Sequence, residues 1–346
     1  MVNKLGKTCP DKIFDKTCND KIYHIDAPCK INLHLAIGER RSDGFHSLES
    51  LFACVALSDT LKFVLSEKEG ECTLSMESEL NTAEGSEELI LGESIPFEDN
   101  LVYKAVTLFR ERTGFKNGLK VFLTKRIPLG AGLGGGSSDA ASTLLALNSF
   151  AKRRASTEEL AEMAAILGSD VPFFLGGGLA FVHGRGEHVE PIEMSKNSFL
   201  AGLSVVLVKP PFPSNTAAAF RLLDEARERK TEAVKPHETP GFYAASRKLG
   251  AIDYLKKDPG TWPFSNDFLP VFLAAGGAES DAYHTILKNL RDSGASFASL
   301  SGAGSCCFGI FTSPEMAKKA VKRITIGGNF VRLTFFLANR TNTVVE

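Results

Sequence analysis

The chain has 346 residues, of which 43% are hydrophobic and 23% charged, and its formal net charge is −1. This length and ordinary composition are typical of a globular protein large enough for two domains with separate cores. The balanced charge gives no basic field for nucleic acid, and no apolar run approaches the roughly 18 residues that cross a bilayer, so we expect neither kind of partner.

The cysteines are scattered, with no CxxC pair and no His/Cys cluster. They are Cys9, Cys18, Cys29, Cys54, Cys72, Cys306 and Cys307. This pattern predicts reduced thiols, no zinc or other metal site, and a cytoplasmic protein. Residues 1–26 mix lysines with aspartates and lack a continuous apolar core, so we expect a solvated extension and neither a secretory signal nor a transit peptide.

The first elements along the chain are predicted strands. Residues 24–38 alternate apolar and polar side chains, as a half-buried strand does. The sequence RRSDG at 40–44 indicates a turn, and residues 51–65 read as further strand. The acidic stretch 67–98, dotted with serine and glycine, favours a hairpin with a long surface loop.

Helices and strands then alternate. The pattern predicts a helix over 100–113, capped by Asp99 or Asn100, a short strand over 119–124 and a helix over 138–148. A helix over 157–167 has Ser156 or Thr157 as cap and Gly168 as stop.

The second half opens with a buried strand over 203–208 and closes with an amphipathic helix over 313–324, whose Ser-Pro-Glu start resembles a cap and first turn. Residues 190–198 show the weakest pattern of helix or strand along the chain. We therefore expect an extension over 1–26, a first domain over 27–192 and a second over 193–346, whose last strand could return to the first domain.

The sequence PLGAGLGGGSSDAA at 128–141 is the strongest functional signal. Glycines let the backbone approach a ligand, and unpaired N–H groups at the start of a helix attract phosphate. A P-loop needs a lysine after the last glycine, and here two serines follow. Gly130, Gly132 and Gly135 satisfy GxGxxG, but residues 150–157 offer no strand and no acid to hold a ribose. A purely structural glycine turn is the remaining alternative.

This motif resembles the central motif of the GHMP kinases, a family that includes the galactose, homoserine and mevalonate kinases. The sequence that starts at Ala27, APCKINLHLAIGERRSDGFHSLESLF, is similar to that of one group within this family. The kinases of this group phosphorylate a cytidine diphosphate-linked methylerythritol, a precursor of isoprenoids. EDNL, TKRIP, LGSDVPFFLGGG and SLSGAGSCCFG follow in order up to about Phe311. The resemblance implies an α+β fold of two lobes with the active site in the cleft between them.

The resemblance also implies the nucleotide site. Asn100 and Lys125 match positions that contact the nucleoside of ATP. The residues that would wrap the triphosphate are Pro128, Gly130, Ala131, Gly132, Leu133, Gly134, Gly135, Gly136, Ser137 and Ser138. A second glycine turn would support this loop and close the cleft, unless it is an ordinary turn before the strand 306–310. It consists of Ser301, Gly302, Ala303, Gly304 and Ser305, with alanine where the family commonly has serine or threonine.

For the chemistry, the resemblance makes Asp170 the catalytic base and Lys30 the ammonium that holds it ionised and lowers the pKa of the substrate hydroxyl. The alternative for Asp170 is a cap of the next helix. Lys30 shares one face of its strand with Asn32 and His34, which fits an exposed lysine as well as a cleft.

Cytidine recognition is implied by DGFH. Phe45, where the family usually has tyrosine, would stack on the base, and His46 would hydrogen-bond its edge. Phe220 matches the aromatic residue on the other side of the base, although Phe at helical spacing also fits core packing. Thr216 and Asn32 match neighbouring polar contacts.

The implied function is transfer of the γ-phosphate of ATP to the 2-hydroxyl of this acceptor, with Mg²⁺ accompanying the nucleotide and no obligate protein partner. The alternatives are another small-molecule GHMP kinase, of homoserine or mevalonate type, and a nucleotide-binding sensor without activity.

Overall fold

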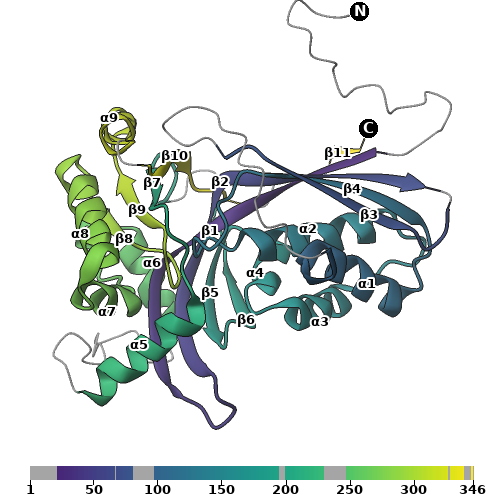
Figure 1. The fold of residues 1–346 in the computed structure, drawn as a ribbon, viewed down its shortest axis with the longest axis horizontal. Coiled ribbons are helices and arrows are strands. Elements are labelled where there is room, and N and C mark those ends of the chain that lie inside the picture. The colour runs from purple at the N-terminus through teal and green to yellow at the C-terminus, as the bar shows by residue number, and fades with distance from the viewer. Residues whose placement is uncertain are drawn as a thin grey trace, which may run out of the picture.

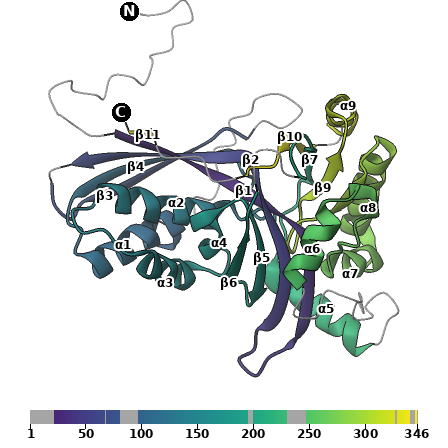
Figure 2. The same ribbon diagram turned by 180° about the vertical axis from the view of Figure 1, so that it is seen from behind.

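The computed structural model describes residues 22–66, 68–80, 97–194, 199–229, 247–325, 328–338 and 344–345. In this part of the chain, helices lie against two sheets, one of seven and one of four strands (Figures 1 and 2). No helix there is both long and apolar enough to cross a membrane.

The larger sheet is organised around two long antiparallel strands, β1 (Ile22–Arg40) and β2 (His46–Ser66). Its other strands are β3 (Cys72–Ser78), β4 (Gly118–Lys125), β5 (Leu179–Gly184), β6 (His188–Ile192) and β11 (Val344–Val345). The order is β11-β1-β2-β4-β3, and β5 pairs with β2 and β6. The C-terminal β11 therefore lies beside the start of β1.

Two expectations for this part of the chain were wrong. The solvated extension does not include residues 22–26, because they pair with β2 and bury Tyr23 and Ile25 in the core; residues 1–21 lie outside the described part. Within the stretch 67–98, the described strand β3 does not form a hairpin with β4, since the two run parallel; residues 67 and 81–96 lie outside the described part. Parallel pairing needs a crossover connection, which the helix between β3 and β4 provides.

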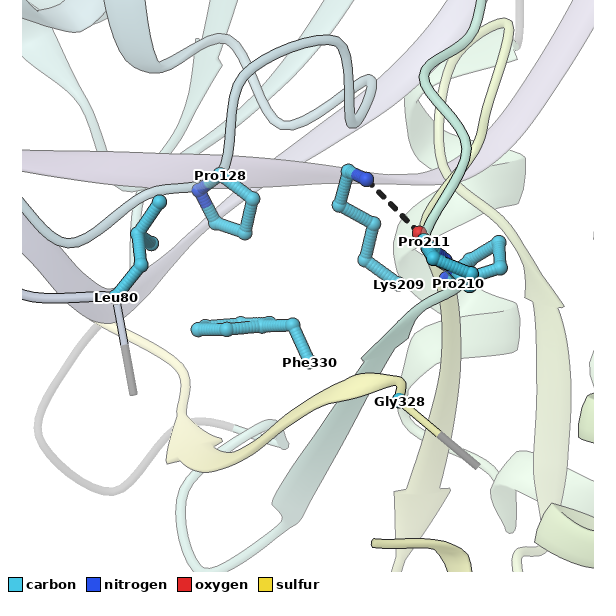
Figure 3. A pocket seen from close by; sticks show the side chains of 7 residues that line it. All are labelled: Leu80, Pro128, Lys209, Pro210, Pro211, Gly328 and Phe330. Carbon is cyan, nitrogen blue, oxygen red and sulfur yellow. Dashed lines mark hydrogen bonds between the residues drawn. The ribbon is translucent and has the colours of Figure 1, made fainter. Parts of the chain in front are cut away.

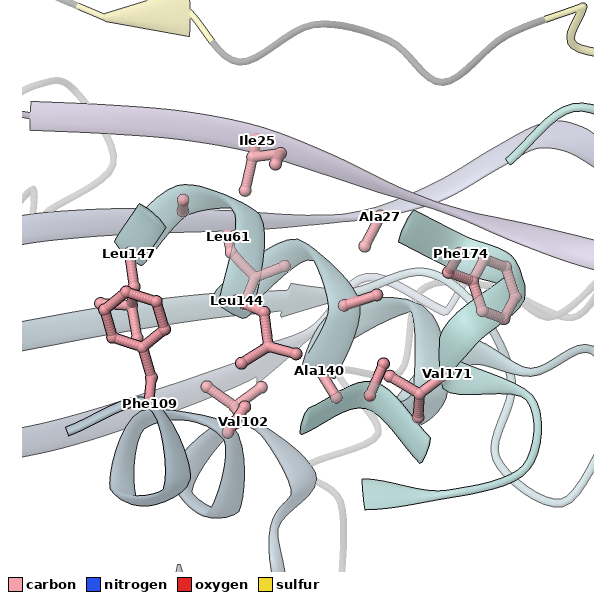
Figure 4. Close-up of a cluster of buried hydrophobic side chains, with 14 of the residues drawn as sticks. Ile25, Ala27, Leu61, Val102, Phe109, Ala140, Leu144, Leu147, Val171 and Phe174 are labelled. Carbon is pink, nitrogen blue, oxygen red and sulfur yellow. The ribbon is translucent and has the colours of Figure 1, made fainter. Parts of the chain in front are cut away.

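Four helices cover one face of this sheet: α1 (Leu101–Thr113), α2 (Gly135–Phe150), α3 (Thr157–Leu167) and α4 (Val171–Gly176). Their predicted caps are confirmed. Asn100 caps α1, Ser156 forms a capping box on α3, and Gly168 ends α3. Figure 4 shows the core between these helices and the sheet, with Leu61 and Ile25 facing Leu144 and Phe109.

The smaller sheet has the order β10-β7-β9-β8 and is antiparallel throughout. Its strands are β7 (Ser204–Lys209), β8 (Phe297–Leu300), β9 (Cys307–Phe311) and β10 (Phe330–Phe335). The accompanying helices are α5 (Thr216–Glu228), α6 (Arg247–Leu255), α7 (Phe268–Ala274), α8 (Gly277–Asp292) and α9 (Pro314–Ile324), with 3₁₀ turns at Phe97–Asp99 and Pro259–Thr261. Ser313 caps α9, as its Ser-Pro-Glu start predicts.

The two sheets share a hydrophobic cluster, and β1 runs through it. Cys29 and Ile31 of β1 are completely buried there together with Val205 and Leu207 of β7. Further along, Leu35 exchanges backbone hydrogen bonds with Ser265 and Asp267 in the second half of the chain. The middle of β1 therefore lies where the two halves of the protein meet.

Candidate active site

The glycine loop connects β4 to α2 and crosses this junction. Gly134 is the N-cap of α2, with φ of 70° and no side-chain cap. No side chain therefore caps the first N–H groups of this 16-residue helix, whose first turn has no acidic residue. Ser138 Oγ, in the same turn, is buried and has no hydrogen-bond partner among the described residues. Such a helix start favours an anionic ligand.

The second glycine turn, between β8 and β9, is hydrogen-bonded to the glycine loop. Ser305 and Cys306 donate backbone N–H groups to the carbonyls of Gly130 and Ala131 at 3.3 and 3.1 Å, and Ser301 Oγ donates to the carbonyl of Gly132 at 2.9 Å. A Cβ on Gly132, whose φ is 71°, would overlap the carbonyl oxygen of Ser301. The turn is therefore hydrogen-bonded directly to the loop, and its expected role in closing the cleft stays a prediction.

Lys30 lies against the same loop. Its backbone N–H donates to Leu133 at 2.9 Å, and a Cβ on Gly134 would lie 3.3 Å from Lys30 Cε. The ammonium is 3.4 Å from Asp170 Oδ2 and 4.4 Å from the centroid of the Phe52 ring. The side chain of Lys30 is 4% exposed, so its charge faces the inside of the site and not bulk solvent.

Asp170 occupies the N-cap position of α4, but its side chain makes no cap hydrogen bond. The capping alternative therefore does not account for this carboxylate. Its side chain is 31% exposed, which leaves it accessible to a ligand while it faces the Lys30 ammonium. Register shifts at Pro28/Cys29 and Asn32/His34 flank Lys30 in β1; bulges of this kind re-aim side chains next to functional sites.

Asn32 belongs to this centre. Its Oδ1 accepts from the Lys30 ammonium at 2.7 Å and from Ser301 Oγ at 3.4 Å, and its Nδ2 donates to Ser50 at 2.9 Å. Its amide is thus engaged with Lys30, Ser50 and the second turn, and the expected contact of Asn32 with the substrate stays a prediction.

Lys125, the predicted nucleoside contact, belongs to a buried ionic cluster. Its ammonium is buried between the carboxylates of Asp59 and Asp139, at 2.7 Å from the latter. Asp59 also accepts from the backbone N–H groups of Arg126 and Ile127. The cluster of Asp59, Lys125 and Asp139 therefore joins the segment entering the glycine loop to the first turns of α2. Asn100, the other predicted nucleoside residue, is buried as the cap of α1, with Oδ1 2.9 Å from the N–H of Val102.

Burial raises the pKa of Asp139 to about 7, and the negative charge of Asp59 adds to this, against the opposing effect of Lys125. Asp139 Oδ1 has no hydrogen-bond partner among the described residues. Burial alone would lower the pKa of Lys125, but the two carboxylates outweigh it and the pKa is raised. A pKa of about 7 lets Asp139 exchange a proton near neutrality.

The predicted base-recognition residues lie at the tip of the β1–β2 hairpin and on α5. Phe45 is 55% exposed, with the guanidinium of Arg185 5.2 Å from its ring centroid. His46 is buried, and its ring stacks on Phe220 at 4.9 Å and 18°. Phe268 meets Phe220 edge-on at 5.0 Å.

His46 thus covers one face of the Phe220 ring, and Phe268 meets the ring edge-on. These contacts fit the packing alternative for Phe220 better than an open ring face that waits for a base. Thr216 is exposed in the first turn of α5. Two residues here were missed by the sequence analysis: Arg185, and Asp224, whose carboxylate is 2.8 Å from His46 Nε2. Each is a charged residue beside a predicted aromatic contact, a relationship that only the fold creates.

A pocket lies beside the start of the glycine loop (Figure 3). It is lined by Leu80, Pro128, Lys209, Pro210, Pro211, Gly328 and Phe330. Burial lowers the pKa of Lys209, whose ammonium turns away to donate to the carbonyls of Pro210 and Phe212 at 2.8 and 3.2 Å. Pro128 alone among the predicted site residues lines this pocket, which is thus separate from the Lys30–Asp170 centre.

Comparison with known proteins identifies the family of this chain. Residues 100–178 match the GHMP kinases N terminal domain, and residues 264–329 match the GHMP kinases C terminal domain. The 4-diphosphocytidyl-2-C-methyl-D-erythritol kinase of Thermodesulfovibrio yellowstonii is 36% identical over 295 residues, covering 85% of this chain and 91% of its own. The enzyme of the same name from Oryza sativa, described as chloroplastic, is 44% identical over 198 residues, which are 57% of this chain and 45% of the rice protein.

Solved structures give the same result. A crystal structure of 4-(cytidine 5'-diphospho)-2C-methyl-D-erythritol kinase matches with a TM-score of 0.65 and 28% identity, covering 90% of this chain and 99% of its own. Homoserine kinase from Cytophaga hutchinsonii matches with a TM-score of 0.62 at 19% identity, covering 96% of this chain and 99% of its own. The second likeness is one of fold alone. The expected α+β, two-lobed fold is confirmed.

Proposed function

Because this chain belongs to the GHMP kinases, and among them to the 4-diphosphocytidyl-2-C-methyl-D-erythritol kinases, we propose that its glycine loop, Lys30 and Asp170 transfer the γ-phosphate of ATP to the 2-hydroxyl of that acceptor. The observation that carries this proposal is the position of the Lys30–Asp170 pair directly beside the glycine loop. A kinase needs both a cradle for the triphosphate and a group that takes the hydroxyl proton.

In this mechanism the loop binds the triphosphate through its backbone N–H groups, and the positive end of α2 stabilises charge that develops on the phosphate. Asp170 accepts the proton as the substrate oxygen attacks phosphorus. The Lys30 ammonium, beside Asp170, lowers the pKa of the substrate hydroxyl. Asn32 fixes the Lys30 ammonium at 2.7 Å, so that it needs no reorganisation during the reaction.

For the acceptor, we propose that Phe45 stacks on the cytosine and His46 hydrogen-bonds its edge. The exposed ring of Phe45 offers the π face that stacking needs. Thr216, exposed at the start of α5, remains a candidate for a neighbouring polar contact. We also keep the division into lobes over 27–192 and 193–346 as a proposal.

Within the described residues, no three His, Cys, Asp or Glu side chains are grouped closely enough to hold a metal ion. We propose that Mg²⁺ enters with ATP and is bound mainly by phosphate oxygens and water. When bound, it neutralises charge on the transferring phosphate. Ser138 Oγ, which is buried and has no hydrogen-bond partner in the described part of the chain, is a candidate to contact the bound triphosphate.

The proposal is tested by coupled measurement of ADP release with the purified protein, Mg²⁺, ATP and one alcohol at a time. We expect turnover with 4-diphosphocytidyl-2-C-methyl-D-erythritol and none with mevalonate, homoserine or galactose. Turnover of one of these three without turnover of the first would contradict the assignment of the acceptor. Binding of ATP without turnover of any alcohol would favour a sensor.

A further inference from the structure

The His46 imidazole is fixed by one helix. Phe220 and Asp224 lie one turn apart on α5, and therefore on the same face of the helix. Phe220 stacks on the imidazole ring, and Asp224 Oδ1 lies 2.8 Å from Nε2. The side chain of His46 is 6% exposed and that of Asp224 30% exposed, so the imidazole has little freedom to rotate.

This contact determines which nitrogen of the imidazole carries a proton. An ionised carboxylate can only accept a hydrogen bond, so Nε2 must be the donor. In the neutral imidazole the other nitrogen, Nδ1, is then purely an acceptor. Within the described part of the chain, no hydrogen bond to Nδ1 is present. The contact between Asp224 and His46 thus leaves Nδ1 of the imidazole as a hydrogen-bond acceptor for a ligand.

We propose that Asp224 is a specificity-determining residue that makes the site select cytosine over uracil, through His46. This inference rests on the proposed function, in which His46 faces the base. Cytosine carries an exocyclic amino group, a donor, where uracil carries the O4 oxygen, an acceptor. Nδ1 pairs with the amino group and opposes O4, and two facing acceptors leave both without a hydrogen bond. Asp224 acts as a positioning residue, since its oxygen is already used on Nε2.

A simpler role for Asp224 would be to dock α5 on the hairpin. The chain offers a matched control for that role, because Arg227 of the same helix donates to the carbonyls of Ile37 and Gly38 on β1 and does not contact His46. Loss of Arg227 weakens the docking of α5 without changing the hydrogen bond at Nε2.

The experiment compares wild type, Asp224→Asn and Arg227→Gln, each with the cytidine diphosphate-linked acceptor and its uridine counterpart. The asparagine amide can donate to Nε2 or accept from it, so the imidazole proton is no longer held on Nε2 and can occupy Nδ1. We expect the ratio of kcat/KM for cytidine over uridine to fall by about tenfold or more in Asp224→Asn, mainly through KM, and to stay unchanged in Arg227→Gln. Equal losses for both acceptors in Asp224→Asn, or the same fall in Arg227→Gln, would overturn the proposal.

Binding of CDP and UDP, measured by calorimetry, gives a readout that does not depend on turnover. We expect wild type to prefer CDP and Asp224→Asn to lose most of that preference. An unchanged preference in Asp224→Asn, with an unchanged melting temperature, would also overturn the inference. If wild type binds neither nucleotide and turns over neither acceptor, the proposed function fails first and independently of Asp224.

Discussion

The ammonium of Lys30 lies 3.4 Å from Asp170 Oδ2, although the two residues belong to a strand and a helix far apart in the chain. Their contact is made at the glycine loop, where the backbone N–H of Lys30 also donates to Leu133. The ammonium, the carboxylate and the glycine loop are thus assembled in one place.

Replacing Asp170 by Asn tests its role as base. The amide keeps the shape of the side chain but cannot take the hydroxyl proton. We expect kcat to fall by roughly 100-fold or more, with the affinity for ATP nearly unchanged. Coupled ADP release and calorimetric titration of ATP measure the two quantities. Asp253→Asn, at an exposed position paired with Lys256, is the control; a near-normal rate in Asp170→Asn would mean that another group is the base.

Gly132→Ala tests the contact between the two glycine turns. The added Cβ would overlap the carbonyl of Ser301 and lie 2.8 Å from that of Gly304, at a positive φ. We expect a loss of about 1–3 kcal/mol in stability together with a raised KM for ATP. Thermal unfolding and steady-state kinetics measure these effects. Gly176→Ala, where a Cβ meets nothing within 4 Å, should change neither.

Asp139→Asn tests the buried cluster through pH. The folded-state pKa of Asp139, about 7, lies above the value near 4 of an unfolded chain. The folded state therefore binds the proton more tightly, and stability is lost as pH rises from about 4 through 7. We expect the melting temperature of wild type to fall relative to that of Asp139→Asn across this range. Parallel curves for the two proteins would show that Asp139 does not titrate there.

Phe45→Ala tests stacking on the base. The ring is more than half exposed, so its removal should cost little stability. We expect KM for the cytidine acceptor to rise about tenfold or more, with KM for ATP unchanged. Phe335→Ala removes a ring that is 60% exposed on β10 and serves as the control. An effect confined to ATP would contradict the stacking role.

Local chemistry made much of the fold predictable. The caps Asn100, Ser156 and Ser313 accept hydrogen bonds from backbone N–H groups two or three residues further along the chain. The local sequence is therefore enough to predict them. The sequence also contains a signal for the earlier start of β1: Tyr23 and Ile25 continue the apolar alternation of the strand toward the N-terminus, and both are buried.

Charge partners were not predictable in the same way. Asp59 and Asp224 have no neighbour in sequence that identifies their role; each acquires it from a residue brought close by strand pairing or helix docking. For the same reason, the resemblance that implied a nucleoside contact for Lys125 could not reveal the two carboxylates that surround its ammonium in the fold. An aspartate inside a predicted buried strand, such as Asp59, is itself a signal, because a buried charge requires a partner.

The path of β1 through both halves of the molecule has a consequence for unfolding. Its first residues pair in the large sheet, its middle is buried among β7 side chains, and its end is bonded to the segment before α7. Neither half can melt without releasing this strand, so calorimetry should record one cooperative transition and no stable half-molecule.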